Sequence, residues 1–131
     1  MATSLNVDIV TPQMAAWSGE AQQVILPAFE GQLGVLPDHD MLLALVVPGI
    51  ATLFTDSGPQ RFVFDSGFAE IGPERVTVLT ESCIPVDQVD KAGAKADLAA
   101  AEAELASLHL ESEAAKVLLR RVAHSKALLE A

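Results

Sequence analysis

Three consecutive residues with reactive side chains, Asp38, His39 and Asp40, stand in a segment otherwise rich in glycine, proline and aliphatic residues. An imidazole beside carboxylates occurs in hydrolytic triads and in metal sites. A metal site needs three or four converging ligands, however, and His39 is the only histidine before residue 85. In an extended segment, adjacent side chains point to opposite sides, so the two carboxylates would face away from the imidazole. We therefore interpret the triplet as part of a surface loop.

Other sequence motifs of catalysis are missing from the chain. There is no G-x-S-x-G segment, no G-x-x-x-x-G-K-[ST] segment and no strand-linked G-x-G-x-x-G segment. His109 and His124 are interpreted as solvent-facing, and the single Cys83 as a small buried hydrophobe without a disulfide. The residues thus favour a non-enzymatic partner protein. The alternative is an enzyme of the cupin type, which would need at least two more His or Glu ligands beside His39 inside a barrel.

Charge and hydropathy exclude two classes of partner. The net charge of the 131-residue chain is −10, so nucleic acid and anionic lipid would both be repelled. The longest apolar run, Met41–Val47, is far shorter than the roughly 20 residues that cross a bilayer, so we expect no direct lipid insertion. The charge is uneven: residues 114–131 contain four bases and one acid, a local charge of +3.

The first part of the chain, residues 1–85, has the pattern of strands and turns. LNVDIV alternates apolar and polar residues, and GIATLF and RFVFDS flank a turn-rich segment, as do GFAEIG and RVTVLT. Turn signals recur often enough to predict an antiparallel β-sandwich, or flattened barrel, of about eight to ten strands. We expect Met41–Val47 to return the chain to the core.

The second part, residues 86–131, has a helical period. Asp87 is predicted to cap a first helix with Asp90 at its third position. Apolar residues recur at intervals of four and three, which predicts two helices that pack as a hairpin, with Ser112 capping the second. Because no Gly or Pro enforces the turn, the hairpin could also straighten into one helix, and the sequence leaves both states open. The two stripes are Ala94, Leu98, Ala101, Leu105 and Leu108, and Ala115, Leu118, Val122, Ser125 and Leu129.

The whole pattern resembles the epsilon subunits of bacterial F-type ATP synthases, essentially from end to end. The resemblance rests on LNVDIVTP, the segment EGQLGVLPDH, PGIATL, RFVFDSGFAEI and RVTVLTE. It implies a central-stalk rotor subunit without catalytic residues that couples proton-driven rotation of the c ring to the catalytic head through the gamma subunit. It also implies a peripheral location on the cytoplasmic face of the bacterial inner membrane.

The same resemblance implies roles for particular residues. Those that would face the c ring are Glu30, Gln32, Asp38 and His39, which we expect at one end of the sandwich. The helical domain would regulate ATP hydrolysis when extended, with cations that touch the catalytic alpha and beta subunits, namely Arg120, Arg121 and Lys116.

Some family members bind ATP through a motif of the form [I/L]-D-x-x-R-A. The matching positions here include Val89, Asp90, Gly93 and Ala94, with Gly93 where the motif has Arg. Loss of that cation removes a partner for the nucleotide, so we expect no cofactor. An ATP-sensing regulator that acts through its helices is the remaining alternative.

Overall fold

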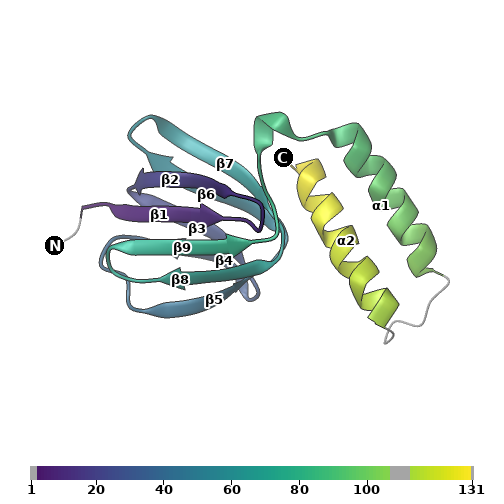
Figure 1. Ribbon diagram of the computed structural model, residues 1–131, viewed down its shortest axis with the longest axis horizontal. Coiled ribbons are helices and arrows are strands. Elements are labelled where there is room, and N and C mark those ends of the chain that lie inside the picture. The colour runs from purple at the N-terminus through teal and green to yellow at the C-terminus, as the bar shows by residue number, and fades with distance from the viewer. Residues whose placement is uncertain (1–2, 107–112, 131) are drawn as a thin grey trace.

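The computed structural model describes residues 3–106 and 113–130. Ten strands precede one turn of 3₁₀ helix, Val86–Gln88, and two α-helices (Figure 1). The strands are β1 (Leu5–Val10), β2 (Ala15–Ala21), β3 (Gln23–Ala28), β4 (Gly31–Val35), β5 (Leu42–Val46), β6 (Gly49–Thr55), β7 (Gly58–Phe64), β8 (Gly67–Ile71), β9 (Arg75–Thr80) and β10 (Cys83–Pro85). The helices are α1 (Lys91–Leu105) and α2 (Glu113–Glu130).

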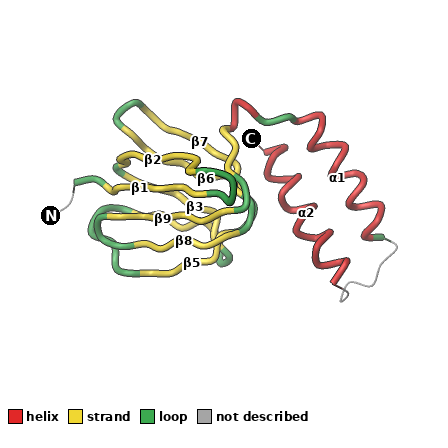
Figure 2. Tube along the Cα trace, in the orientation of Figure 1, coloured by secondary structure: helices red, strands yellow, loops and turns green. Residues whose placement is uncertain are grey.

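The strands form one strongly curved sheet that folds over on itself as a sandwich, with both helices on one side of it (Figures 1 and 2). Its order is β10-β7-β6-β3-β5-β8-β9-β1-β2, and β4 pairs with β3 outside this path. The predicted sandwich followed by a helical hairpin is confirmed. Pairing is antiparallel as expected, except between β1 and β9, which run parallel.

The core of the sandwich is aliphatic and follows the alternation seen in the sequence. In β1 the apolar residues Leu5, Val7 and Ile9 are fully buried, whereas Asn6 is exposed. Sixteen buried residues from the strands form one contiguous cluster. Cys83 is partly buried against this cluster, in agreement with its interpretation as a small hydrophobe.

Both predicted hairpins are present. β6 pairs with β7 around a turn at Asp56 and Ser57, where Gly58 has φ 107°, a left-handed conformation that favours glycine. β8 pairs with β9 from Ile71 and Val76 outward. These turns set the register that directs one face of each strand inward.

The first helix begins later than predicted. Asp90, not Asp87, is its N-cap, and Asp90 Oδ1 accepts a hydrogen bond of 2.9 Å from the backbone N–H of Gly93. Asp87 lies instead in the 3₁₀ turn. Both aspartates are residues that favour an N-cap, and the 3₁₀ turn takes up Asp87 and leaves Asp90 to cap the helix.

The helices form a hairpin, one of the two states that the sequence leaves open. Ala101, Leu118 and Val122 are its buried core, with Leu98 and Leu105 packed at the side. The predicted stripes therefore face each other, although Leu108, His109 and Ser112 lie outside the described residues. Neither described helix is long and apolar enough to span a membrane.

Candidate docking surfaces

A row of exposed apolar side chains crosses three neighbouring strands of the sandwich. Leu45 of β5 pairs with Phe68 of β8, and Phe68 pairs with Leu79 of β9. Their exposed fractions are 51%, 51% and 52%. Each of the three has a buried residue next to it in its strand. Because successive side chains of a strand point to opposite faces, the row points outward. Contiguous exposed apolar surface of this kind marks sites of interaction with other proteins.

The row continues onto the turn between β3 and β4. Phe29 in this turn is 74% exposed, and its backbone N–H donates a hydrogen bond of 3.0 Å to the carbonyl of Leu45. Leu43, two residues before Leu45, is also exposed. An open groove of about 460 Å³ lies between this turn and β5. We call the surface made by Phe29, Leu43, Leu45, Phe68 and Leu79 the docking face.

The prediction that Met41–Val47 returns the chain to the core is wrong for most of the run, although Val46 is in the core cluster and Ala44 packs against it. Within this run only Val46 is buried, whereas Met41, Leu43 and Leu45 are exposed. A strand that is apolar on both faces needs cover on both faces, and a sandwich supplies cover on one. The missing alternation in the LLALV segment was therefore the signal of a second contact surface.

The predicted ring-facing residues fall into two groups, separated by β4. Glu30 lies in the turn before β4 and lines the groove beside Phe29, and Gln32 is exposed on β4 itself. Asp38 and His39 follow the other end of this five-residue strand, roughly 13 Å further along at 3.3 Å per residue. The segment that we expected at one end of the sandwich thus spans a strand.

The loop that carries Asp38 and His39 is tied to the β8–β9 turn. Asp38 has φ 68°, and its backbone N–H donates a hydrogen bond of 2.7 Å to the carbonyl of Pro73. Nδ1 of His39 lies 2.6 Å from the carbonyl oxygen of Asp40. The imidazole is thus engaged by backbone. Among the described residues, no group of three or more His, Cys, Asp or Glu side chains converges as a metal site would require.

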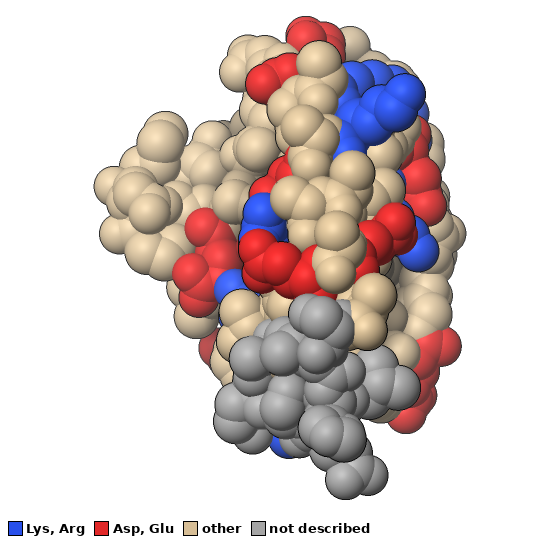
Figure 3. Space-filling view, turned by 90° about the vertical axis from the view of Figure 1, so that its right-hand side faces the viewer, with Lys and Arg blue, Asp and Glu red and all other residues tan. Residues whose placement is uncertain are grey.

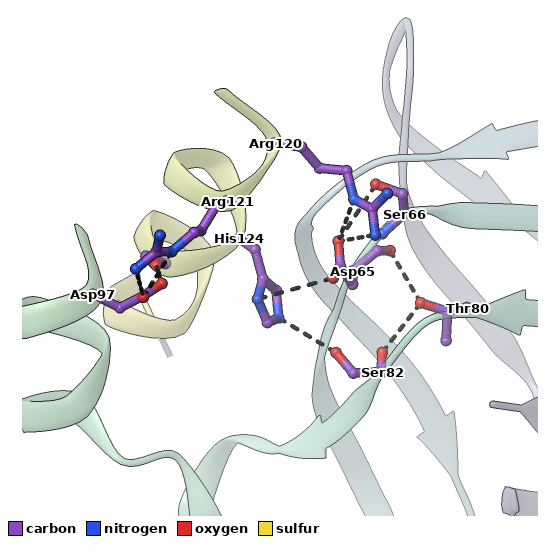
Figure 4. Close-up of polar contacts among 9 residues, drawn as sticks. Asp65, Ser66, Thr80, Ser82, Asp97, Arg120, Arg121 and His124 are labelled. Atoms are coloured by element: carbon purple, nitrogen blue, oxygen red, sulfur yellow. Dashed lines mark hydrogen bonds and ion pairs between the residues drawn. The ribbon is translucent and has the colours of Figure 1, made fainter. Parts of the chain in front are cut away.

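The two arginines of α2 point in different directions (Figure 4). Arg121 donates to Oδ1 of Asp97 on α1, from Nε at 2.8 Å and also from its second terminal nitrogen, and Ser125 Oγ donates to Oδ2 of Asp97 at 2.9 Å. These hydrogen bonds, from Arg121 first and then Ser125, hold the pKa of the Asp97 carboxyl below its ordinary value. The pair joins the two helices.

Arg120 faces the sandwich instead. Its Nε lies 3.6 Å from Oδ1 of Asp65, and Nδ1 of His124 lies 4.0 Å from Oδ2 of the same carboxylate. The third predicted cation, Lys116, is exposed on α2. In this conformation Arg120 and Arg121 both contact carboxylates of the same chain. Figure 3 shows that acidic side chains are interspersed with the cations on this side of the molecule.

The degenerate nucleotide motif has a structural role in the start of α1. Asp90 caps the helix through the N–H of Gly93, and a Cβ at Gly93 would overlap with Oδ2 of Asp90. Ala94 is buried, and Val89 is partly buried beside the cap. The Asp90 carboxylate of the motif therefore accepts a hydrogen bond from the backbone of its own helix.

Sequence comparisons point to one family. Residues 4–86 match the family model described as "ATP synthase, Delta/Epsilon chain, beta-sandwich domain". A protein of Bordetella parapertussis named ATP synthase epsilon chain is 36% identical over 95% of this chain and all of its own length. Another of the same name from Sinorhizobium fredii is 37% identical over 80% of this chain and 79% of its own.

Structure comparisons show the same fold in larger assemblies. A chain in the mitochondrial ATP synthase of Euglena gracilis, a structure of OSCP, F1 and the c-ring, superposes with a TM-score of 0.82 at 18% identity and covers 98% of this chain and 81% of its own. A chain from the central stalk and c-ring of the Tetrahymena thermophila mitochondrial ATP synthase gives a TM-score of 0.67 at 13% identity, over 96% and 94% of the two chains.

Proposed function

The chain belongs to the ATP synthase epsilon chain family, and we propose on that premise that it is a non-catalytic central-stalk subunit of an F-type ATP synthase. Its relatives share the name over most of their length, and chains of the same fold occur in F1 and c-ring assemblies. In this role it transmits rotation of the c ring to the catalytic head through the gamma subunit.

The docking face is the observation that carries this proposal. A subunit that turns with its neighbours needs a contact that persists through each revolution, and permanent interfaces are the more hydrophobic ones. The docking face supplies aromatic and aliphatic side chains on rigid strands, which is the composition of an interface core. We assign it to the gamma subunit.

The polar residues beside this face are assigned to the c ring. Glu30 and Gln32 lie next to the groove, and Asp38 and His39 lie beyond β4. Exposed carboxylates and an imidazole suit polar loops, because rim contacts of this kind set orientation more than affinity. Variants Glu30→Ala and His39→Ala should reduce ATP-driven proton pumping in membrane vesicles without weakening the binding of gamma.

Binding of gamma tests the docking face directly. Phe68→Glu puts a charge at the centre of the row, and we expect the Kd for purified gamma to rise by at least about tenfold. The matched control is Val117→Glu, because Val117 is also apolar and is 67% exposed, against 51% for Phe68, but lies on α2. Circular dichroism would show that both variants fold. A folded Phe68→Glu variant that binds gamma as tightly as the unchanged chain would refute the assignment.

The helical hairpin is proposed to regulate ATP hydrolysis. When extended, it would bring Arg120, Arg121 and Lys116 to carboxylates on the catalytic alpha and beta subunits, since guanidinium groups pair well with carboxylates. The comparison is the ATPase activity of the complex with the full chain and with a chain that ends at Val86. The sandwich core contains no residue of the described hairpin, so the shortened chain should fold. An ATPase activity that does not rise on truncation would exclude the regulatory role.

We also propose a peripheral location at the cytoplasmic face of the bacterial inner membrane, with no cofactor. The location follows from the assembly, and high-salt or chelator washes that strip F1 from membranes should release this chain with it. Because Asp90 caps α1, we expect no heat of binding when Mg-ATP is titrated into the isolated chain at micromolar concentration. Tight binding would support the ATP-sensing alternative.

A further inference from the structure

Asp65 lies where the helical hairpin meets the sandwich. It stands in the short connection between β7 and β8, and its side chain is only 14% exposed. Its carboxylate is covered by Arg120 on one oxygen and His124 on the other, and the N–H of Ser66 donates to Oδ1 at 2.7 Å (Figure 4). A carboxylate that is mostly removed from water needs such partners.

A second connection holds Asp65 in place. The backbone N–H of Asp65 donates 3.3 Å to the carbonyl of Ser82, and Glu81 N–H donates 3.1 Å to the carbonyl of Ser66. The buried Thr80 hydroxyl lies 3.0 Å from the carbonyl of Asp65 and 3.1 Å from that of Ser82. The β7–β8 and β9–β10 connections therefore form one rigid platform, and Ser82 Oγ of this platform lies 3.3 Å from Nε2 of His124.

Apolar packing between the hairpin and the strands is local: α2 packs on β6 and β7, where Val63 is fully buried. Among the described residues, the buried cluster of the sandwich and that of the hairpin share no member. The side-chain contacts between the platform and α2 are polar. The Arg120 side chain is 55% exposed, and its Nε lies 3.6 Å from Oδ1 of Asp65. Ion pairs that remain this exposed are weak, so the polar contacts between α2 and the platform break at little cost in free energy.

We propose that Asp65 is the acceptor of a reversible latch that holds α2 on the sandwich through Arg120 and His124. While the latch is closed, Arg120 and His124 face the sandwich and are withheld from carboxylates of any other protein. When it opens, Asp65 is rehydrated and both side chains become available to other partners. The docking itself is a property of the isolated chain, whereas its use in regulation rests on the proposed function.

Distance measurements between spin labels on the full chain test the latch. The labels are placed at Glu74 in the β8–β9 turn and Ala123 on α2, both exposed, in a Cys83→Ala background. Asp65→Asn keeps an oxygen that accepts from the Ser66 N–H and removes the negative charge. We expect the ratio of docked to open molecules to fall about threefold. Asp8→Asn is the matched control, because Asp8 pairs with Arg75 and Ser18 on the sandwich itself.

Arg120→Gln provides the second arm, since an exposed helix residue can be changed without unfolding the sandwich. It should open the hairpin by less than Asp65→Asn does, because the contact of His124 with Asp65 remains, and the double variant should open it no further than Asp65→Asn alone, because the interaction of Arg120 with Asp65 is then already lost. Unchanged docking in both single variants, or effects that multiply in the double variant, would overturn the latch. If the latch holds but Asp65→Asn leaves ATPase activity of the complex unchanged, the regulatory role fails and the latch stands.

Discussion

The sandwich and the helical hairpin bury apolar surface on very different scales. The sandwich core has sixteen buried residues, including Phe64, Leu5 and Ile9 at full burial. The hairpin core has three, and one of them is alanine. Because stabilisation by burial grows with the apolar area removed from water, the sandwich is a permanent structure, whereas the hairpin depends on its contacts. The docking face and Asp65 lie on the permanent part, and the hairpin is the part that can change.

The largest effect should follow from a cavity in the sandwich. Phe64→Ala removes a fully buried ring, and such changes lower the free energy of unfolding by about 3–5 kcal/mol. Chemical denaturation followed by circular dichroism measures the loss. A loss of stability smaller than that caused by Leu118→Ala in the hairpin would contradict the contrast between the two parts.

A cavity in the hairpin should unfold only the hairpin. Leu118→Ala truncates the largest buried side chain of that core and should lower its stability by about 2–4 kcal/mol. A core of three residues has few other contacts to offset this loss. We expect the helical signal to fall while the sandwich keeps its resonances in a ¹H–¹⁵N spectrum. Leu119→Ala is the control, because the adjacent leucine is 44% exposed. Simultaneous loss of both parts would show that they fold as one unit.

A smaller effect should come from the pair between the helices. Asp97 and Arg121 are both more than a third exposed, so Asp97→Asn should lower the stability of the hairpin by no more than about 1 kcal/mol. The folded pKa of Asp97 is lowered, so this contribution is present above the ordinary value of 3.8 and is lost as pH falls through the folded pKa. A helical signal that declines equally in acid with and without Asp97→Asn would contradict this.

The smallest effect concerns Cys83 at the base of the hairpin. Burial raises the pKa of its thiol from 9.0 to about 11, which cuts the thiolate fraction at pH 8. Allowing for the higher nucleophilicity of a more basic thiolate, alkylation by iodoacetamide should be about tenfold slower than in the urea-unfolded chain. Equal rates would show that Cys83 is accessible and that the junction is looser than described.

The sequence predicted the architecture because each segment agrees with its local pattern. LNVDIV alternates and becomes β1, and the two helical stripes face each other. The N-cap was misplaced because Asp87 and Asp90 are both residues that favour this position, and the 3₁₀ turn that contains Asp87 has no distinct sequence signature. The parallel pairing of β1 with β9 is a long-range contact that periodicity does not encode.

The candidate site was less predictable for a different reason. Leu43 and Leu45 look like core residues because hydropathy does not say which face of a strand is covered. Asp65 is one of eighteen acidic residues in the chain and carries no motif, and only the fold brings it to Arg120 and His124. Contacts between residues that are distant in the sequence depend on the fold. They cannot be predicted from the pattern of one segment alone.

The chain between β10 and α1 gives the junction a further property. Only residues 86–90 link Pro85, which is paired with Phe62 of β7, to the start of α1 at Lys91. Five residues span at most about 17 Å, so a hairpin that lets go stays within reach of the sandwich. Re-docking is then intramolecular, with an effective concentration that short tethers place in the millimolar range. A partner that competes with the sandwich for the hairpin must be present at a comparable effective concentration. A partner that meets the chain only briefly therefore leaves the hairpin docked, whereas a partner in the same assembly can bind it.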